Sequence, residues 1–339
     1  MTHRRFYWLE KLQVQLSTAA AMLAVYFLVW PLLRPADPEM PLTFLVGDHV
    51  AALGTFALLA VVLAVVVGLL TVTARPEGAL MAVVLGLAAA ALRSGDFSAL
   101  LRLEQDRTSS LFVTMILETL LLAAIVLAAA VIVALVRRSV AKLWPRAAFH
   151  SPLEGVLPNA DLARPQFLTI ALTAGGGIEG YLVASKVSKT PPKADAKAVK
   201  AAAPAALLTR GAYCFGLALA VAGILLMLLL RSDSRGQVIF AIIVAFAAAM
   251  LIAHQLFPGP FVLAAFLLPL VAAVVFYVLG STANVGSGPQ DWTAVPVYCR
   301  ALPVDWMTFG TGGAMLGYWV SSRIYDMRHL EAAQKDDNE

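Results

Sequence analysis

Six long stretches of apolar residues determine what this chain can form. Each has at most one ionisable residue. Each is also close to the roughly 20 residues that a helix needs, at 1.5 Å per residue, to cross a hydrocarbon core about 30 Å thick. The stretches are residues 12–33, 50–73, 110–136, 211–230, 236–253 and 261–280. Only 14% of all residues are charged, against about 25% in soluble domains. We therefore expect an all-α, polytopic bundle of transmembrane helices that contacts the lipid bilayer.

Two weaker stretches bring the expected number of spans to about eight. Residues 78–92 are short, and residues 304–322 are diluted by glycine and polar side chains. If both cross and the N-terminus is cytoplasmic, 18 of the 25 Lys and Arg residues lie inside and seven outside, as the positive-inside rule requires. A ninth span at residues 166–185 would divide them 12 to 13, which argues against it. We expect a multi-pass protein of the cytoplasmic (inner) membrane with both termini in the cytoplasm.

The eight spans fall into two groups of four, separated by a long connector. We expect a first transmembrane half at residues 1–136, a cytoplasmic connector at 137–209, a second half at 210–324 and a cytoplasmic tail at 325–339. Within the connector, residues 186–204 are rich in Lys, Ala and Pro and have almost no large apolar side chain, so they should be flexible. Their lysines could hold an anionic membrane surface or a protein partner, or the linker could be a plain tether.

Glu118 is the most informative single residue, because it lies well inside an apolar stretch. A carboxylate near the middle of a membrane is costly, so it should face the bundle interior or a hydrated cavity. Thr114 lies one turn earlier on the same helix face and could share a hydrogen bond with it. No other expected span has a Lys or Arg near its centre to act as partner. Glu118 would then be a proton- or ion-coupling group, or alternatively a neutral acid bonded to a neighbouring helix.

A glycine-rich segment in the connector formally matches a dinucleotide-binding pattern. Gly175, Gly177 and Gly180 have the G-x-G-x-x-G spacing, with Glu179 before the last glycine. The connector is too short for the sheet that such a fold needs, so we treat the match as accidental. A re-entrant or interfacial hairpin is a better interpretation, and a mobile connector is an equal alternative.

Small residues recur at helical spacing in the last expected span. Gly310, Gly313 and Gly317, followed by Ser321, form a stripe that would let another helix backbone approach closely. Similar alanine and glycine stripes occur in residues 78–92 and 236–253. We expect helix packing from these stripes. A weak likeness between residues 78–92 and 236–250 would also fit an inverted repeat, the architecture of many transporters.

Several classes of function lack their sequence signatures. The histidines and the two cysteines, Cys214 and Cys299, show no metal-ligand spacing, and no zinc protease, nucleotide-hydrolase or serine-hydrolase motif occurs. The basic residues flank apolar stretches rather than forming aromatic-interleaved patches, so we expect no nucleic-acid partner. We also expect no metal and no cofactor. Because Cys214 and Cys299 would lie near opposite membrane faces, we expect no disulfide between them.

These observations leave three functions open. A transporter or permease fits the eight spans and the carboxylate of Glu118. A non-catalytic membrane subunit or scaffold of a larger envelope complex fits the scarcity of intramembrane polar groups, because solute pathways usually need several. An intramembrane enzyme would have to use Asp48 with His49, or Asp305. We expect a permease-like protein that is not an enzyme, with the scaffold as the alternative.

Overall fold

Every regular element in the described part of the chain is helical. The computed structural model describes residues 6–35, 37, 40–46, 50–74, 76–143, 196–257, 262–283 and 291–336. The main helices are α1 (Phe6–Ala24), α2 (Trp30–Leu33), α3 (Val50–Leu70), α4 (Pro76–Ala91), α5 (Phe97–Leu103), α6 (Thr108–Leu143), α9 (Ala196–Leu229), α10 (Arg235–Leu256), α11 (Val262–Ser281), α12 (Pro303–Asp305) and α13 (Thr311–Asp336). Two π-helices, η2 (Val25–Val29) and η9 (Trp306–Gly310), continue α1 into α2 and α12 into α13. The expectation of an all-α protein is confirmed.

Six of these helical segments are long and apolar enough to cross a membrane. They are Lys11–Leu33, Ala51–Leu70, Thr108–Val140, Thr209–Leu229, Arg235–Leu256 and Val262–Ser281. They coincide with the six apolar stretches read from the sequence, because a lipid-facing helix must be apolar over its own length. The protein is therefore an integral, multi-pass membrane protein.

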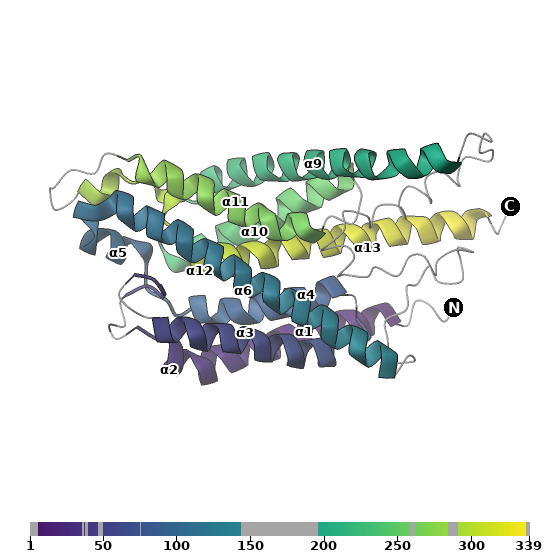
Figure 1. Cartoon of the computed structure of the whole chain (residues 1–339), viewed down its shortest axis with the longest axis horizontal. Helices are drawn as coiled ribbons and strands as arrows, with labels where there is room; N and C mark the ends of the chain where they lie inside the picture. Colours follow the sequence, from purple (N-terminus) through teal and green to yellow (C-terminus); the bar gives the residue numbers. More distant parts are fainter. Residues whose placement is uncertain are drawn as a thin grey trace.

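The long helices run roughly along the long axis of the molecule, so the bundle has two ends (Figure 1). The beginnings of α1 and α9 and the ends of α6 and α13 lie at one end, which we call the tail end. Helices α5 and α12 lie at the other, which we call the loop end. The loop end also carries residues 40–46, the turn between α9 and α10, and residues 291–302.

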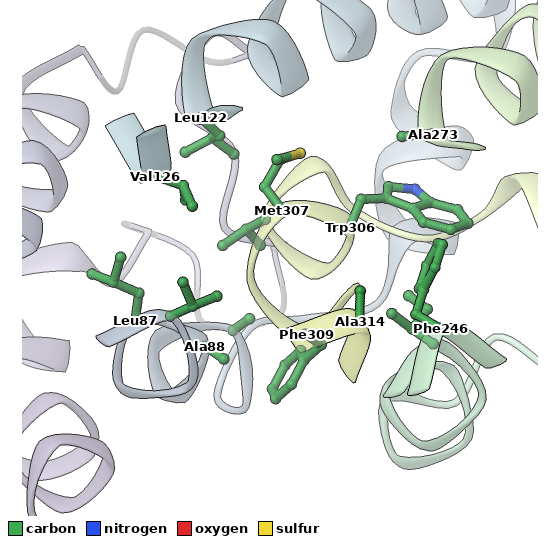
Figure 2. Packing of buried hydrophobic residues seen from close by; sticks show 14 of the residues in the cluster. Leu87, Ala88, Leu122, Val126, Phe246, Ala273, Trp306, Met307, Phe309 and Ala314 are labelled. Atoms are coloured by element: carbon green, nitrogen blue, oxygen red, sulfur yellow. The ribbon is translucent and has the colours of Figure 1, made fainter. Parts of the chain in front are cut away.

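Helix α4 and the start of the α12–η9–α13 segment occupy the middle of the bundle. Helix α4 packs against α1, α3, α6 and α13, and residues 79–84 and 87–91 are all buried. Residues 301–315 are buried without interruption. Figure 2 shows side chains of α4, α6, α10, α11 and the η9–α13 segment meeting there, among them Leu87, Leu122 and Met307. Helices that face only other helices need not be strongly apolar, which explains why both segments read as marginal spans.

The first membrane-crossing helix carries a π-helical interruption just before a proline. Pro31 has no N–H to donate to the carbonyl of Phe27, so the regular α-helical ladder cannot continue through this turn. The π-helical turn at Val25–Val29 accommodates this change, and it packs against α4. The second π-helix, η9, also packs against α4.

Two helices are longer than the sequence suggested. Helix α6 continues to Leu143, and α9 begins at Ala196, inside the linker that we expected to be flexible. The alanine-rich composition of residues 196–206 explains the helix, because alanine has the highest helix propensity. Residues 144–195, which include the rest of that linker, lie outside the described part of the chain.

Candidate functional site

A non-helical segment enters the bundle at the loop end. Residues 41–44 lie between α2 and α3 without regular structure, yet all four are buried. The Leu42 amide donates to the Ser94 hydroxyl over 2.7 Å, and the Gly95 amide donates to the Met40 carbonyl over 3.3 Å. The Phe44 ring packs on Phe56 of α3, with 5.3 Å between ring centroids. Residues 40–46, which we call the re-entrant segment, are therefore anchored at the entrance to α5 and against α3.

Glu118 of α6 accepts the deepest polar contacts of the re-entrant segment. Its side chain is fully buried, and its Oε2 accepts hydrogen bonds from the Phe44 and Leu45 amides, each over 3.0 Å. Non-helical backbone surrounded by apolar helices must find partners for its N–H groups, and a carboxylate oxygen is a strong acceptor. Glu118 lies ten residues after the start of α6, about 15 Å along the helix.

The second carboxylate oxygen of Glu118 is buried and has no hydrogen-bond partner among the described residues. Thr114 does not supply one, because its half-buried hydroxyl donates to the Ser110 carbonyl over 3.0 Å. The Thr119 hydroxyl likewise donates to the Met115 carbonyl. The shared hydrogen bond suggested by the spacing of Thr114 and Glu118 is thus absent. One oxygen of this acid holds two backbone amides, and the other is available to a proton.

Tyr277 of α11 lies between α6 and the stretch of chain that leads to a second buried carboxylate, that of Asp305. Its ring is fully buried, and its hydroxyl donates to the Ala301 carbonyl over 2.7 Å. Phe112 of α6, six residues before Glu118, packs on the Tyr277 ring with centroids 5.9 Å apart. Tyr277 therefore links the helix that carries Glu118 to the residues just before Asp305, at the loop end of an otherwise apolar interior.

Asp305 forms a buried, bidentate ion pair with Arg235. The Arg235 Nη1 and Nη2 atoms each lie 2.7 Å from a different oxygen of Asp305, whose side chain is fully buried. Arg235 Nη2 also donates to the Ala91 carbonyl at the end of α4, and Asp305 accepts from the Leu302 amide. The pair joins the first residue of α10 to the ends of α4 and α12. The sequence showed Asp305 as a charge at the edge of a weak span, but not its partner 70 residues earlier.

A cap of polar and aromatic residues covers the loop end beside this ion pair. Trp292 contacts two guanidinium groups, with the Cζ atoms of Arg102 and Arg300 at 4.7 and 5.1 Å from its ring centroid. Arg300 also donates to the Val295 and Thr293 carbonyls and lies 3.5 Å from Asp233. These contacts join α5, the α9–α10 turn and residues 291–300.

Burial shifts the acid–base properties of this cap. It raises the pKa of the Asp96 carboxyl above its usual value, although the nearby Arg235 acts in the opposite sense. Burial also lowers the pKa of Arg300, although Asp233 opposes that shift. The Cys299 thiol, buried in the same cap, has a pKa raised to about 12 and is therefore neutral at physiological pH. Both Cys299 and Cys214 are buried free thiols, so they form no disulfide.

The glycine stripe of the last helical segment contacts α10. A Cβ atom added to Gly313 would lie 2.6 Å from the Ile243 carbonyl oxygen, and one on Gly317 would collide with the Ala247 carbonyl oxygen. At Gly310 the nearest atom would be the Pro269 Cβ of α11, at 2.7 Å. Ser321 continues the stripe, and its hydroxyl bonds to His254 Nδ1 and Gln255 Nε2, each over 2.7 Å. Glycine at positions 313 and 317 therefore allows backbone of α10 to touch α13.

Several residues singled out from the sequence lie outside the described part of the chain. They are Gly175, Gly177, Glu179 and Gly180 of the connector, and Asp48 with His49 before α3. Their expected roles remain predictions. Within the described ranges, no group of three or more His, Cys, Asp or Glu side chains is arranged to hold a metal ion.

No protein-family model, curated protein or solved structure matches the chain.

Proposed function

We propose that this protein is a permease-like transporter in which Glu118 is the proton-coupling group. The main support for this proposal is the hydrogen bonding and burial of the Glu118 carboxylate. One oxygen holds the Phe44 and Leu45 amides, the other has no partner among the described residues, and the whole group is buried. A buried intramembrane acid without a paired cation is costly, and such acids commonly mark proton or ion pathways.

The surroundings of Glu118 support the same proposal. Transporters build their sites from interrupted helices and irregular backbone, because these expose polar backbone groups inside the membrane. The re-entrant segment supplies such backbone next to Glu118. The π-helices η2 and η9 interrupt two segments that pack on the central helix α4, and such interruptions frequently occur at functional sites.

We further propose eight crossings with both termini in the cytoplasm. Helix α4 has 16 residues, about 24 Å at 1.5 Å per residue, and it is enclosed by other helices. Helix α1 begins and α13 ends at the tail end, which agrees with an even number of crossings (Figure 1). The positive-inside rule then assigns the tail end to the cytoplasmic face of an inner membrane.

Proton flux in reconstituted vesicles tests the role of Glu118. Vesicles carry a trapped pH-sensitive dye and an inside-negative potassium diffusion potential. They are assayed alone and with a mixture of amino acids, sugars and organic acids. We expect the protein to accelerate internal acidification over empty vesicles in at least one condition. Glu118→Gln should return the rate to that of empty vesicles, because a neutral amide cannot exchange the proton.

The control for this experiment is Asp233→Ala, which alters a half-exposed acid of the cap. It should retain the flux of the parent protein. Vesicles with the parent protein that acidify no faster than empty ones in either condition would contradict the proposal, as would full flux in Glu118→Gln.

A non-catalytic membrane subunit is the second candidate, and the packing of the interior favours it. The residues labelled in Figure 2, among them Leu87, Val126 and Phe309, form a dense apolar centre. Solute pathways usually present several polar groups along their length. If the protein is such a subunit, purification in mild detergent should return a stoichiometric partner, and deletion of residues 150–190 should release it. A partner-free protein would exclude this candidate.

A further inference from the structure

We infer that the re-entrant segment is a gate at the loop end, held shut by the ionised form of Glu118 and released when the acid takes up a proton. This inference rests on the proposed function, since it assigns the conformational consequence of protonating the same group. The latch is the pair of hydrogen bonds from the Phe44 and Leu45 amides to one oxygen of Glu118.

The re-entrant segment has few other polar attachments at this depth. The Leu42 amide binds Ser94 and the Met40 carbonyl binds the Gly95 amide, both at the entrance to α5. The Thr43 hydroxyl donates to the Val46 carbonyl within the segment itself. After Leu42, the segment's hydrogen bonds to other described elements all go to Glu118. Glu118 is therefore the one acceptor outside the segment that holds its inner part among the described residues.

Protonation weakens this acceptor for a simple electrostatic reason. Hydrogen bonds to an ionised carboxylate are roughly twice as strong as bonds to a neutral group. The oxygen that can take the proton is Oε1, because it has no partner among the described residues, whereas Oε2 already accepts both amides. A proton on Oε1 neutralises the group without requiring any other protein contact to break first. The amides then lose the charge that held them.

The neighbouring helices offer little to compensate for that change. In the elements packed on α6 and on the re-entrant segment, the buried or half-buried titratable groups described toward the loop end are Tyr277 of α11, Asp305 of α12, which is paired with Arg235, and Asp96 at the entrance to α5. Helix α3, the re-entrant segment and η9 contain no titratable side chain in their described ranges. The Tyr277 hydroxyl donates to Ala301. The charge of Glu118 is therefore balanced mainly by the two amides, and the segment should respond to its protonation.

The direction of opening follows from the position of the segment. Residues 40–46 enter from the loop end, beside Ser94 and Gly95, and Thr43 and Phe44 are covered in the closed state. Release of the two amides frees the inner part of the segment while its Met40 and Leu42 attachments remain. Glu118 would then become accessible from the loop end.

Cysteine accessibility tests this gate. Thr43→Cys places a thiol at a position only 3% exposed, and Leu103→Cys provides a reference at a position 65% exposed. Both are labelled with a membrane-impermeant methanethiosulfonate reagent at pH 5 and pH 8. The Thr43→Cys rate is divided by the Leu103→Cys rate at the same pH. We expect the ratio to rise about fivefold or more at pH 5, as a shift of roughly 1 kcal/mol predicts.

A second variant identifies the group responsible. In Thr43→Cys with Glu118→Gln, the ratio should be high at both pH values, because the amide mimics the protonated acid. Val126→Cys, buried in α6 away from the segment, should stay unlabelled throughout. A ratio that is low and independent of pH in both backgrounds would overturn the gate.

Hydrogen exchange of the parent protein provides an independent readout if a variant fails to fold. Exchange of the Phe44 and Leu45 amides, corrected for intrinsic rates and referred to α4, should be faster at pH 5 than at pH 8. Equal protection at both values would overturn the gate. If Glu118→Gln abolishes proton flux while accessibility and exchange stay independent of pH, the gate is wrong and the proposed function stands. If instead the segment opens in a pH-dependent way but the protein carries no proton flux, the gate stands and the proposed transport function is wrong.

Discussion

Replacing Asp305 with alanine is expected to lower the free energy of unfolding by about 3–5 kcal/mol, because it leaves a buried guanidinium without its counter-charge. Arg235 donates two 2.7 Å hydrogen bonds to this carboxylate, and its side chain is only 16% exposed. The Leu302 amide loses its acceptor as well. Thermal and dodecyl-sulfate unfolding in detergent, followed by tryptophan fluorescence, should report the loss.

A matched ion pair of the same loop end provides the control. Asp233 lies 3.5 Å from Arg300, and its side chain is 34% exposed. Asp233→Ala should therefore cost no more than about 1 kcal/mol. Asp305→Leu combined with Arg235→Met should recover most of the stability lost in Asp305→Ala, because apolar groups of similar volume replace a buried pair at little cost. Equal unfolding midpoints for Asp305→Ala and Asp233→Ala would contradict the assignment of a buried pair.

The membrane-crossing helices were predictable because their requirement is local. A helix exposed to lipid must be apolar along its whole length, and the six stretches read from the sequence coincide with the six helical segments that meet this condition. Residues 78–92 and 304–322 were only weak predictions for the same reason. Their neighbours are other helices, so small and polar residues are tolerated there. A hydropathy score alone therefore does not identify these two segments clearly as spans.

The candidate site was predictable only in part. A carboxylate within an apolar stretch stands out, so Glu118 was found. Its partners were not, because they are backbone amides 73 and 74 residues earlier in the chain, and any non-proline residue carries such a group. The Arg235–Asp305 pair was missed because its members lie at the ends of different apolar stretches, where charges are ordinarily solvated. A proline-rich stretch before residue 42 was the one local sign of irregular backbone.

The glycine stripe of α13 is expected to be the second most sensitive feature of the bundle. Replacing Gly313 and Gly317 together with alanine should lower the free energy of unfolding by about 3 kcal/mol or more, because each new methyl group meets a carbonyl oxygen of α10 rather than a flexible side chain. Backbone cannot move aside without shifting the whole helix, so α10 and α13 must separate over this length. Tryptophan-monitored thermal unfolding in detergent measures the effect.

The same two exchanges in α9 form a matched control. Gly216 and Gly223 have open space where a Cβ would be built, with no atom within 4 Å. Gly216→Ala with Gly223→Ala should therefore leave stability unchanged or raise it, since alanine favours a helix over glycine by about 1 kcal/mol per residue. Because this gain in helix propensity also applies at positions 313 and 317, the difference between the two double variants isolates the contact between the helices. If both variants gained stability equally, α10 and α13 could not be in backbone contact at Ile243 and Ala247.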